Sequence, residues 1–92
     1  MDKSVTKARR KPQTIFVVDD QESILTSVTS VLTDEHYRVL TFTSAEALQA
    51  GLKAERPDLI LLDIWLPGID GVQALIELKA KDAKLPVVLM SG

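Results

Sequence analysis

The sequence contains no cysteine, only four glycines and four prolines, and no apolar run longer than four residues. The absence of cysteine excludes a disulfide framework and a thiolate metal site. Because no apolar run is long enough, no segment predicts a membrane span, and the basic start lacks the apolar region of a signal peptide. The absence of cysteine also suits a reducing compartment, so we expect a cytoplasmic protein that makes no membrane contact.

The length of 92 residues, with 46% hydrophobic and 26% charged residues, predicts one small globular domain. Charge is distributed unevenly, because residues 1–13 carry five basic side chains and one acidic one, whereas residues 14–92 carry six basic and twelve acidic ones. We interpret residues 1–13 as a basic, flexible, solvated leader. A nucleic-acid or membrane contact of this tail is the alternative. The acidic remainder is a poor partner for phosphate backbones, so no direct nucleic-acid contact is expected from it.

Short apolar runs alternate with helical periodicity along residues 14–92. The runs rich in β-branched and aromatic residues predict strands over residues 14–19, 37–42, 58–62 and 86–90. Apolar residues at helical spacing predict three amphipathic helices between these strands. Their expected apolar faces are Ile24, Leu25, Val28, Val31 and Leu32, then Ala45, Leu48 and Leu52, then Val72, Leu75 and Ile76.

The ends of the predicted helices carry recognisable signals. The first helix is expected over residues 22–35, and the second begins after either Thr43 or Ser44 as its N-cap. His36, the only histidine, follows the first helix, where a cation suits the helix dipole. We interpret it as a surface residue at this helix end, and a role in phosphotransfer is the alternative.

The alternation of strands and helices predicts an α/β fold with a doubly wound parallel sheet. Central strands that are apolar on both faces fit a sheet covered on both sides. In such sheets, the functional crevice lies beyond the carboxyl ends of the strands. The residues at these ends are Asp19 and Asp20 after the first strand, Asp63 at the third, and Ser91 after the fourth.

If the strand order is 2-1-3-4, Asp19, Asp20 and Asp63 converge at one edge of the sheet, with Ser91 one strand further along. Three crowded carboxylates repel one another, and a divalent cation removes this repulsion. Oxygen ligands without histidine or cysteine favour Mg²⁺, which often shares its coordination sphere with a phosphate. The pattern therefore predicts phosphoryl chemistry, in which a carboxylate can itself be the nucleophile.

Each of these residues taken alone has a simpler interpretation. An aspartate at a strand end is often a turn residue or a helix N-cap, and this applies to Asp63 and to the pair Asp19 and Asp20. Ser91 alone is uninformative. The combination on the first, third and fourth strands is what favours a site.

Three segments, FVVDDQ, DLILLDIWLPGIDG and PVVLMSG, resemble the receiver domains of two-component response regulators, and the resemblance extends from Thr14 to the end of the sequence. It implies a flavodoxin-like receiver fold with strand order 2-1-3-4, a strand order for which the receiver family is itself a standard example. The residues of the second and third segments resemble those of receivers of the nitrogen-regulation, sigma-54 activator type. Such receivers commonly precede an ATPase and a DNA-binding output domain.

The resemblance also implies roles for individual residues. Asp63 matches the phosphoacceptor, which takes a phosphoryl group from a sensor histidine kinase. The implied Mg²⁺ ligands are Asp20 directly, Asp19 through water, Asp63, and the backbone carbonyl of Trp65, whose ring we expect to be partly exposed. Pro67 and Gly71 match the loop that shapes the pocket, and Ser91 matches the hydroxyl that moves toward the phosphoryl group.

The resemblance stops at the fourth strand, so the last helix, strand and helix of a receiver are not matched, nor is the family's lysine on the fifth strand. We expect slower phosphoryl transfer, an uncovered apolar sheet surface, and self-association of the chain or a longer natural protein. The alternative is a receiver-like interaction module that is not phosphorylated. A phosphohydrolase is not expected, because Trp65 stands where such enzymes typically place a second acid.

Overall fold

The computed structural model describes residues 12–90, so residues 1–11 of the predicted leader and the predicted switch residue Ser91 lie outside the described residues. Strands and helices alternate as the sequence predicts: β1 (Thr14–Val18), α2 (Glu22–Asp34), β2 (Arg38–Phe42), α3 (Ala45–Ala54), β3 (Leu59–Asp63), α4 (Gly71–Lys81) and β4 (Val87–Met90). Between residues 12 and 90, no helix has the length and apolar character needed to cross a membrane.

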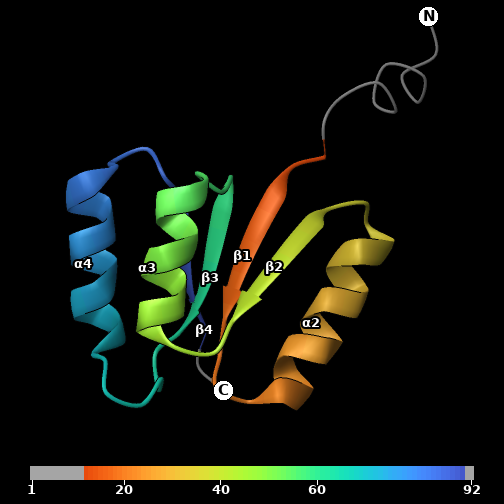
Figure 1. Cartoon of the computed structure of the whole chain (residues 1–92), viewed down its shortest axis with the longest axis horizontal. Coiled ribbons are helices and arrows are strands. Elements are labelled where there is room, and N and C mark those ends of the chain that lie inside the picture. Colours follow the sequence, from red (N-terminus) through yellow and green to blue (C-terminus); the bar gives the residue numbers. More distant parts are fainter. Residues whose placement is uncertain (1–11, 91–92) are drawn as a thin grey trace, which may run out of the picture.

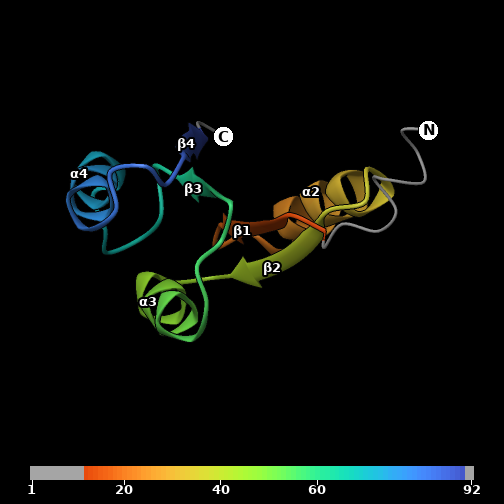
Figure 2. The same cartoon turned by 90° about the horizontal axis from the view of Figure 1, so that it is seen from above.

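The four strands form one parallel sheet in the order β2-β1-β3-β4. Helix α2 lies on one face of this sheet, and α3 and α4 lie on the other (Figure 1, Figure 2). Because the strands are parallel, their carboxyl ends all lie at one edge of the sheet, at the bottom of Figure 1. This arrangement confirms the predicted doubly wound α/β fold and its strand order.

Strand β1 lies at the centre of the molecule, and all five of its residues are buried. Phe16 and Val18 pack into a cluster with residues of α3 and α4, whereas Ile15 and Val17 pack with Leu25 of α2. A strand that is buried on both faces needs apolar residues at successive positions, which explains the unbroken apolar run.

Strand β3 is covered less completely than the sequence predicts. Ile60 and Leu62 are fully buried toward α3 and α4, but Leu59 and Leu61 on the α2 face are only partly buried. Val88 of β4, which pairs with Leu61, is 48% exposed. The reason is that α2 packs against β1 and β2. The prediction that helices cover both faces of the sheet is therefore confirmed for β1 and wrong for β3. The partly exposed residues of β3 and β4 form the uncovered apolar surface that was also predicted.

The predicted helix faces are partly wrong, most clearly in α4. Its buried residues are Gly71, Ala74 and Leu78, which share one face of the helix at spacings of three and four. The small residues Gly71 and Ala74 allow α4 to approach its neighbours closely. A search for large apolar residues at helical spacing does not detect such positions. The predicted face residues that turn out exposed are Ile24 and Val31 on α2 and Val72 and Ile76 on α4.

Side-chain hydrogen bonds fix where α3 and α4 begin. The Oγ atom of Ser44 accepts a hydrogen bond from the Ala47 backbone N–H at 3.1 Å, so Ser44 and not Thr43 is the N-cap of α3. Asp70 caps α4, because its Oδ1 atom accepts hydrogen bonds from the backbone N–H groups of Val72 and Gln73. This second cap was not predicted from the sequence.

The third strand begins one residue later than predicted, because Asp58 has another role. Its carboxylate accepts a hydrogen bond from the Thr14 backbone N–H at 2.7 Å, and its own N–H donates to the Thr14 carbonyl at 2.8 Å. Asp58 therefore ties the start of β1 to the start of β3 and helps to set the register of the two strands that end in acids.

His36 ends α2 in a left-handed backbone conformation, with φ of 69°. The His36 N–H donates to the Thr33 carbonyl at 2.9 Å, and the Tyr37 N–H donates to the Leu32 carbonyl at 3.1 Å. This pair of hydrogen bonds is a Schellman motif, in which glycine usually occupies the left-handed position. The structure thus confirms His36 as a surface residue at the helix end.

We expect His36→Gly to stabilise the protein by about 1 kcal/mol, because a Cβ atom at positive φ costs roughly 1–2 kcal/mol and the added chain entropy of glycine offsets part of the gain. Urea unfolding followed by circular dichroism measures the change. His36→Ala, which keeps the Cβ atom, is the control and should not stabilise. An equal gain in both variants would show that the imidazole, and not the backbone, is unfavourable.

Candidate functional site

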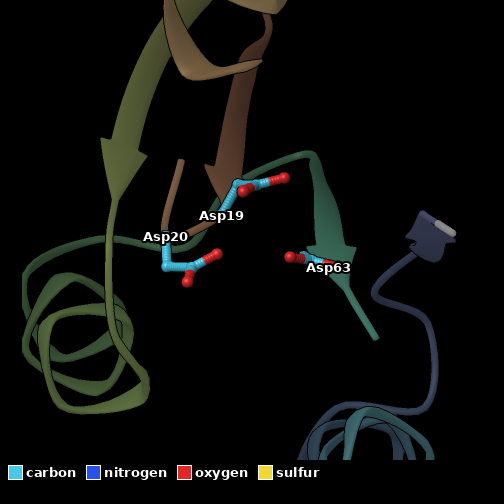
Figure 3. A group of neighbouring side chains, drawn as sticks. All are labelled: Asp19, Asp20 and Asp63. Carbon is cyan, nitrogen blue, oxygen red and sulfur yellow. The ribbon is translucent and has the colours of Figure 1, made fainter. Parts of the chain in front are cut away.

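Three acidic side chains meet where β1 and β3 end. Val18 pairs with Leu62 in the sheet, so Asp19 and Asp63 leave adjacent strands at neighbouring positions. Figure 3 shows Asp19, Asp20 and Asp63 around one space at this edge. One carboxylate oxygen from each residue lies within 4.8 Å of the other two. The predicted convergence of these three residues is therefore present.

Backbone N–H groups orient the two buried carboxylates. Asp19 and Asp63 are 6% and 7% exposed, whereas Asp20 is exposed. Oδ1 of Asp19 accepts a hydrogen bond from the Gln21 N–H at 2.8 Å, and Oδ1 of Asp63 accepts one from the Trp65 N–H at 2.9 Å. Each buried carboxylate is thereby held by its own turn and keeps its second oxygen for another partner.

Helix capping does not account for these aspartates. The N-cap of α2 is Gln21, and no side chain caps the first turn. Helix α4 is capped by Asp70, seven residues after Asp63. The turn interpretation is correct for one oxygen of Asp19 and one of Asp63, but it leaves the burial and convergence of the acids unexplained.

In the described part of the chain, the negative charge of these three aspartates is not balanced by a paired basic side chain. Between residues 12 and 90, no lysine, arginine or histidine forms an ion pair with Asp19, Asp20 or Asp63. Their donor set consists only of carboxylate oxygens, which suits a hard divalent cation such as Mg²⁺. The residues present thus fit the metal ion that the sequence predicts.

The loop after Asp63 folds tightly against the start of α4. Leu66 is 2% exposed and anchors the loop in the core, while the Trp65 side chain is 72% exposed, as predicted. Gly68 follows Pro67 with φ of 77°, a conformation that favours glycine. A Cβ atom on Gly71 would lie 2.6 Å from the Ile64 Cα atom, so glycine is required for this approach. Pro67 therefore lies in this loop, whereas Gly71 is the first residue of α4 and packs against the loop.

Ser91 lies outside the described residues, and its role stays a prediction. Its neighbour Met90 ends β4, pairs with Asp63, and accepts a hydrogen bond from the Ile64 N–H at 3.1 Å. The end of β4 thus lies beside the end of β3.

Comparison with known proteins points to one family. The family described as "Response regulator receiver domain" matches residues 15–92. The nitrogen assimilation regulatory protein NtrX of Azorhizobium caulinodans is 41% identical over 80 residues, which cover 85% of this chain and 18% of that protein. Sporulation initiation phosphotransferase F of Bacillus subtilis is 40% identical over 80 residues, covering 85% of this chain and 63% of that protein. The chain thus spans less than two thirds of either relative.

Solved structures agree with these relatives. The receiver domain of NtrX from Brucella abortus superposes with a TM-score of 0.76 at 39% identity, covering 82% of this chain and 64% of that chain. A CheY-like response regulator receiver domain protein from Methanospirillum hungatei gives a TM-score of 0.83 at 28% identity, covering 89% of this chain and 66% of that chain.

Proposed function

The chain belongs to the response regulator receiver family of two-component systems, and from this premise we propose that Asp63 accepts a phosphoryl group from a sensor histidine kinase. The observation that carries the proposal is the meeting of Asp19, Asp20 and Asp63 at the carboxyl edge of β1 and β3. Membership of this family makes the chain a regulatory signalling domain rather than an enzyme in its own right.

The hydrogen bonds of Asp63 indicate which oxygen reacts. Oδ1 accepts the Trp65 N–H, and Oδ2 has no hydrogen bond within residues 12–90. Oδ2 attacks the phosphorus atom of the donor's phosphohistidine as an anion. The P–N bond breaks, its electron pair stays on the imidazole nitrogen, and a P–O bond forms to give an acyl phosphate.

Asp20 and Asp63 would hold Mg²⁺ directly, Asp19 would hold it through water, and the Trp65 carbonyl would complete the protein ligands. The ion supplies charge neutralisation between the anionic carboxylate and the anionic phosphoryl group. Asp20 suits direct coordination because it is the exposed member of the cluster. Asp19 is buried and already held by the Gln21 N–H, which suits a supporting role.

Phosphorylation adds negative charge and acceptor oxygens at the edge of the sheet. The hydroxyl of Ser91 then moves toward the phosphoryl group, and the surface next to it changes its preference for a partner. We infer a cytoplasmic protein whose output domain is an ATPase or a DNA-binding domain. The DNA-binding transcriptional regulator NtrC of Salmonella typhimurium, 34% identical over 78 residues, supports the DNA-binding output.

Incubation with acetyl phosphate and Mg²⁺ tests the proposed function, with intact-mass spectrometry to detect one added phosphoryl group. We expect slow incorporation that requires Mg²⁺ and is abolished in Asp63→Asn, because an amide is not a competent nucleophile. Asp70→Asn, which changes the acid that caps α4 at the far end of the loop after β3, is the matched control and should still be phosphorylated. Equal incorporation in Asp63→Asn would refute the assignment, and none in the folded native chain would favour the unphosphorylated interaction module.

The partly exposed sheet favours self-association of the chain. On the α2 face, an apolar surface extends from Leu59 and Leu61 of β3 to Val88 of β4, the strand at the edge of the sheet. We propose that a second copy of the chain covers this surface. Light scattering during size-exclusion chromatography should give a mass above that of one chain, and Val88→Lys should reduce it. A monomer at high concentration would refute self-association.

A further inference from the structure

A groove of 370 Å³ lies between α3 and α4, on the face of the sheet opposite α2. It is formed where these two helices end, and therefore lies toward the amino-terminal edge of the sheet, at the top of Figure 1 and away from Asp19, Asp20 and Asp63. The proposed phosphoryl chemistry does not use it. Its volume falls within the range of small-molecule sites, about 300–1,000 Å³.

The groove combines an apolar floor with unpaired positive charge. The floor is formed by Leu52, Leu78 and Leu85, of which the last two are 5% and 3% exposed. Lys53 of α3 and Lys81 of α4 line the groove from its two helices, and neither forms an ion pair within residues 12–90. The groove thus offers apolar contacts and two ammonium groups to one occupant.

The other charged groups at the groove are already engaged. Arg56, which precedes β3, forms an ion pair with Asp82 at the end of α4. Hydrogen bonding to Arg56 lowers the pKa of the Asp82 carboxyl, so that carboxylate is ionised at neutral pH and balances the guanidinium. Lys79 donates to the Leu85 carbonyl at 2.8 Å and holds the segment that carries this leucine. These contacts brace the groove, and a preformed site binds at lower entropic cost.

We propose that this groove binds a small amphipathic carboxylate, with its apolar body against the three leucines and its carboxylate between Lys53 and Lys81. The apolar floor disfavours a purely ionic ligand such as inorganic phosphate, which would leave the leucines uncovered. The two lysines disfavour a neutral or cationic ligand, because only an anion complements them. The site is independent of Asp63 and therefore of the proposed phosphorylation.

Titration of the full chain with 4-phenylbutyrate, followed by ¹⁵N-¹H correlation spectra, tests the site. We expect saturable shifts of the amides of Gln49, Leu52, Leu78 and Leu85, and none at Asp19 or Trp65. The neutral analogue 4-phenylbutanamide and the short anion acetate should each bind more weakly, because each lacks one half of the recognition. Shifts that do not saturate, or that map to the exposed face of β3 and β4, would overturn the proposal.

A pair of substitutions tests the two lysines. Lys53→Gln combined with Lys81→Gln removes both charges while keeping residues that favour helices, and should weaken binding by about fivefold. Lys84→Gln is the matched control, since it removes the same charge beside the groove without lining it. Unchanged affinity in the double variant, or an equal loss in the control, would overturn the role of the lysines.

Discussion

Replacing Asp20 with asparagine is expected to weaken Mg²⁺ binding by at least about tenfold, because it removes one of the two carboxylates that would hold the ion directly. Asp19 and Asp63 are the other two acids of the cluster in the described part of the chain. Trp65, the only tryptophan, lies two residues after Asp63, and its backbone N–H is bonded to that carboxylate. Its fluorescence is therefore the signal to follow during a Mg²⁺ titration.

The same substitution should have opposite effects on stability with and without the metal ion. Without Mg²⁺, Asp20→Asn removes repulsion among the three carboxylates and should raise the free energy of unfolding. With saturating Mg²⁺, the native protein gains binding energy that the variant lacks, so the order should reverse. Asp34→Asn, which neutralises an exposed acid at the end of α2, is the matched control and should show no reversal. A native protein whose fluorescence and stability ignore Mg²⁺ would contradict the metal site.

The sequence predicted the order of elements well because β1 and β3 are short apolar runs with clear ends. Asp19, Asp20 and Asp63 were found for the same reason, since each follows directly from a strand boundary. The strand order that brings them together came from the family resemblance, because periodicity does not say which parallel strands are neighbours. Given that strand order, the positions of the three aspartates at the strand ends were sufficient to predict that they meet.

The sequence did not predict contacts that depend on how elements pack. Val72 and Ile76 were placed in the core because they are apolar, yet Ala74 and Leu78 face the sheet. The cap formed by Asp70 was also not predicted, because the functional interpretation of this segment rested on Asp63 and the loop residues after it. The groove between α3 and α4 was also missed, because it is built from the ends of two helices that are far apart in sequence. Hydrophobic pattern alone carries no information about such pairings.

Gly71→Ala is expected to destabilise the protein by about 1–3 kcal/mol, although alanine is the better helix former. The reason lies in the contact of the helix with the loop after β3. An added Cβ atom would lie 2.6 Å from the Ile64 Cα and 3.1 Å from its Cβ atom. The obstacle is backbone rather than the end of a flexible side chain, so either α4 or the loop has to move.

That movement should reach the acidic cluster, because Ile64 directly follows Asp63. The Ile64 N–H also donates a hydrogen bond to the Met90 carbonyl at the end of β4. We therefore expect Gly71→Ala to weaken Mg²⁺ binding as well as to lower the urea concentration at which the protein unfolds. Gly68→Ala is the control in the same loop, since a Cβ atom there meets nothing within 4 Å and the cost is strain at a φ of 77°. It should lower stability and leave Mg²⁺ affinity nearly unchanged. If both variants lost stability equally and neither lost affinity, the close approach at Gly71 would serve only to pack the loop, and the position of Asp63 would be set by β3 alone.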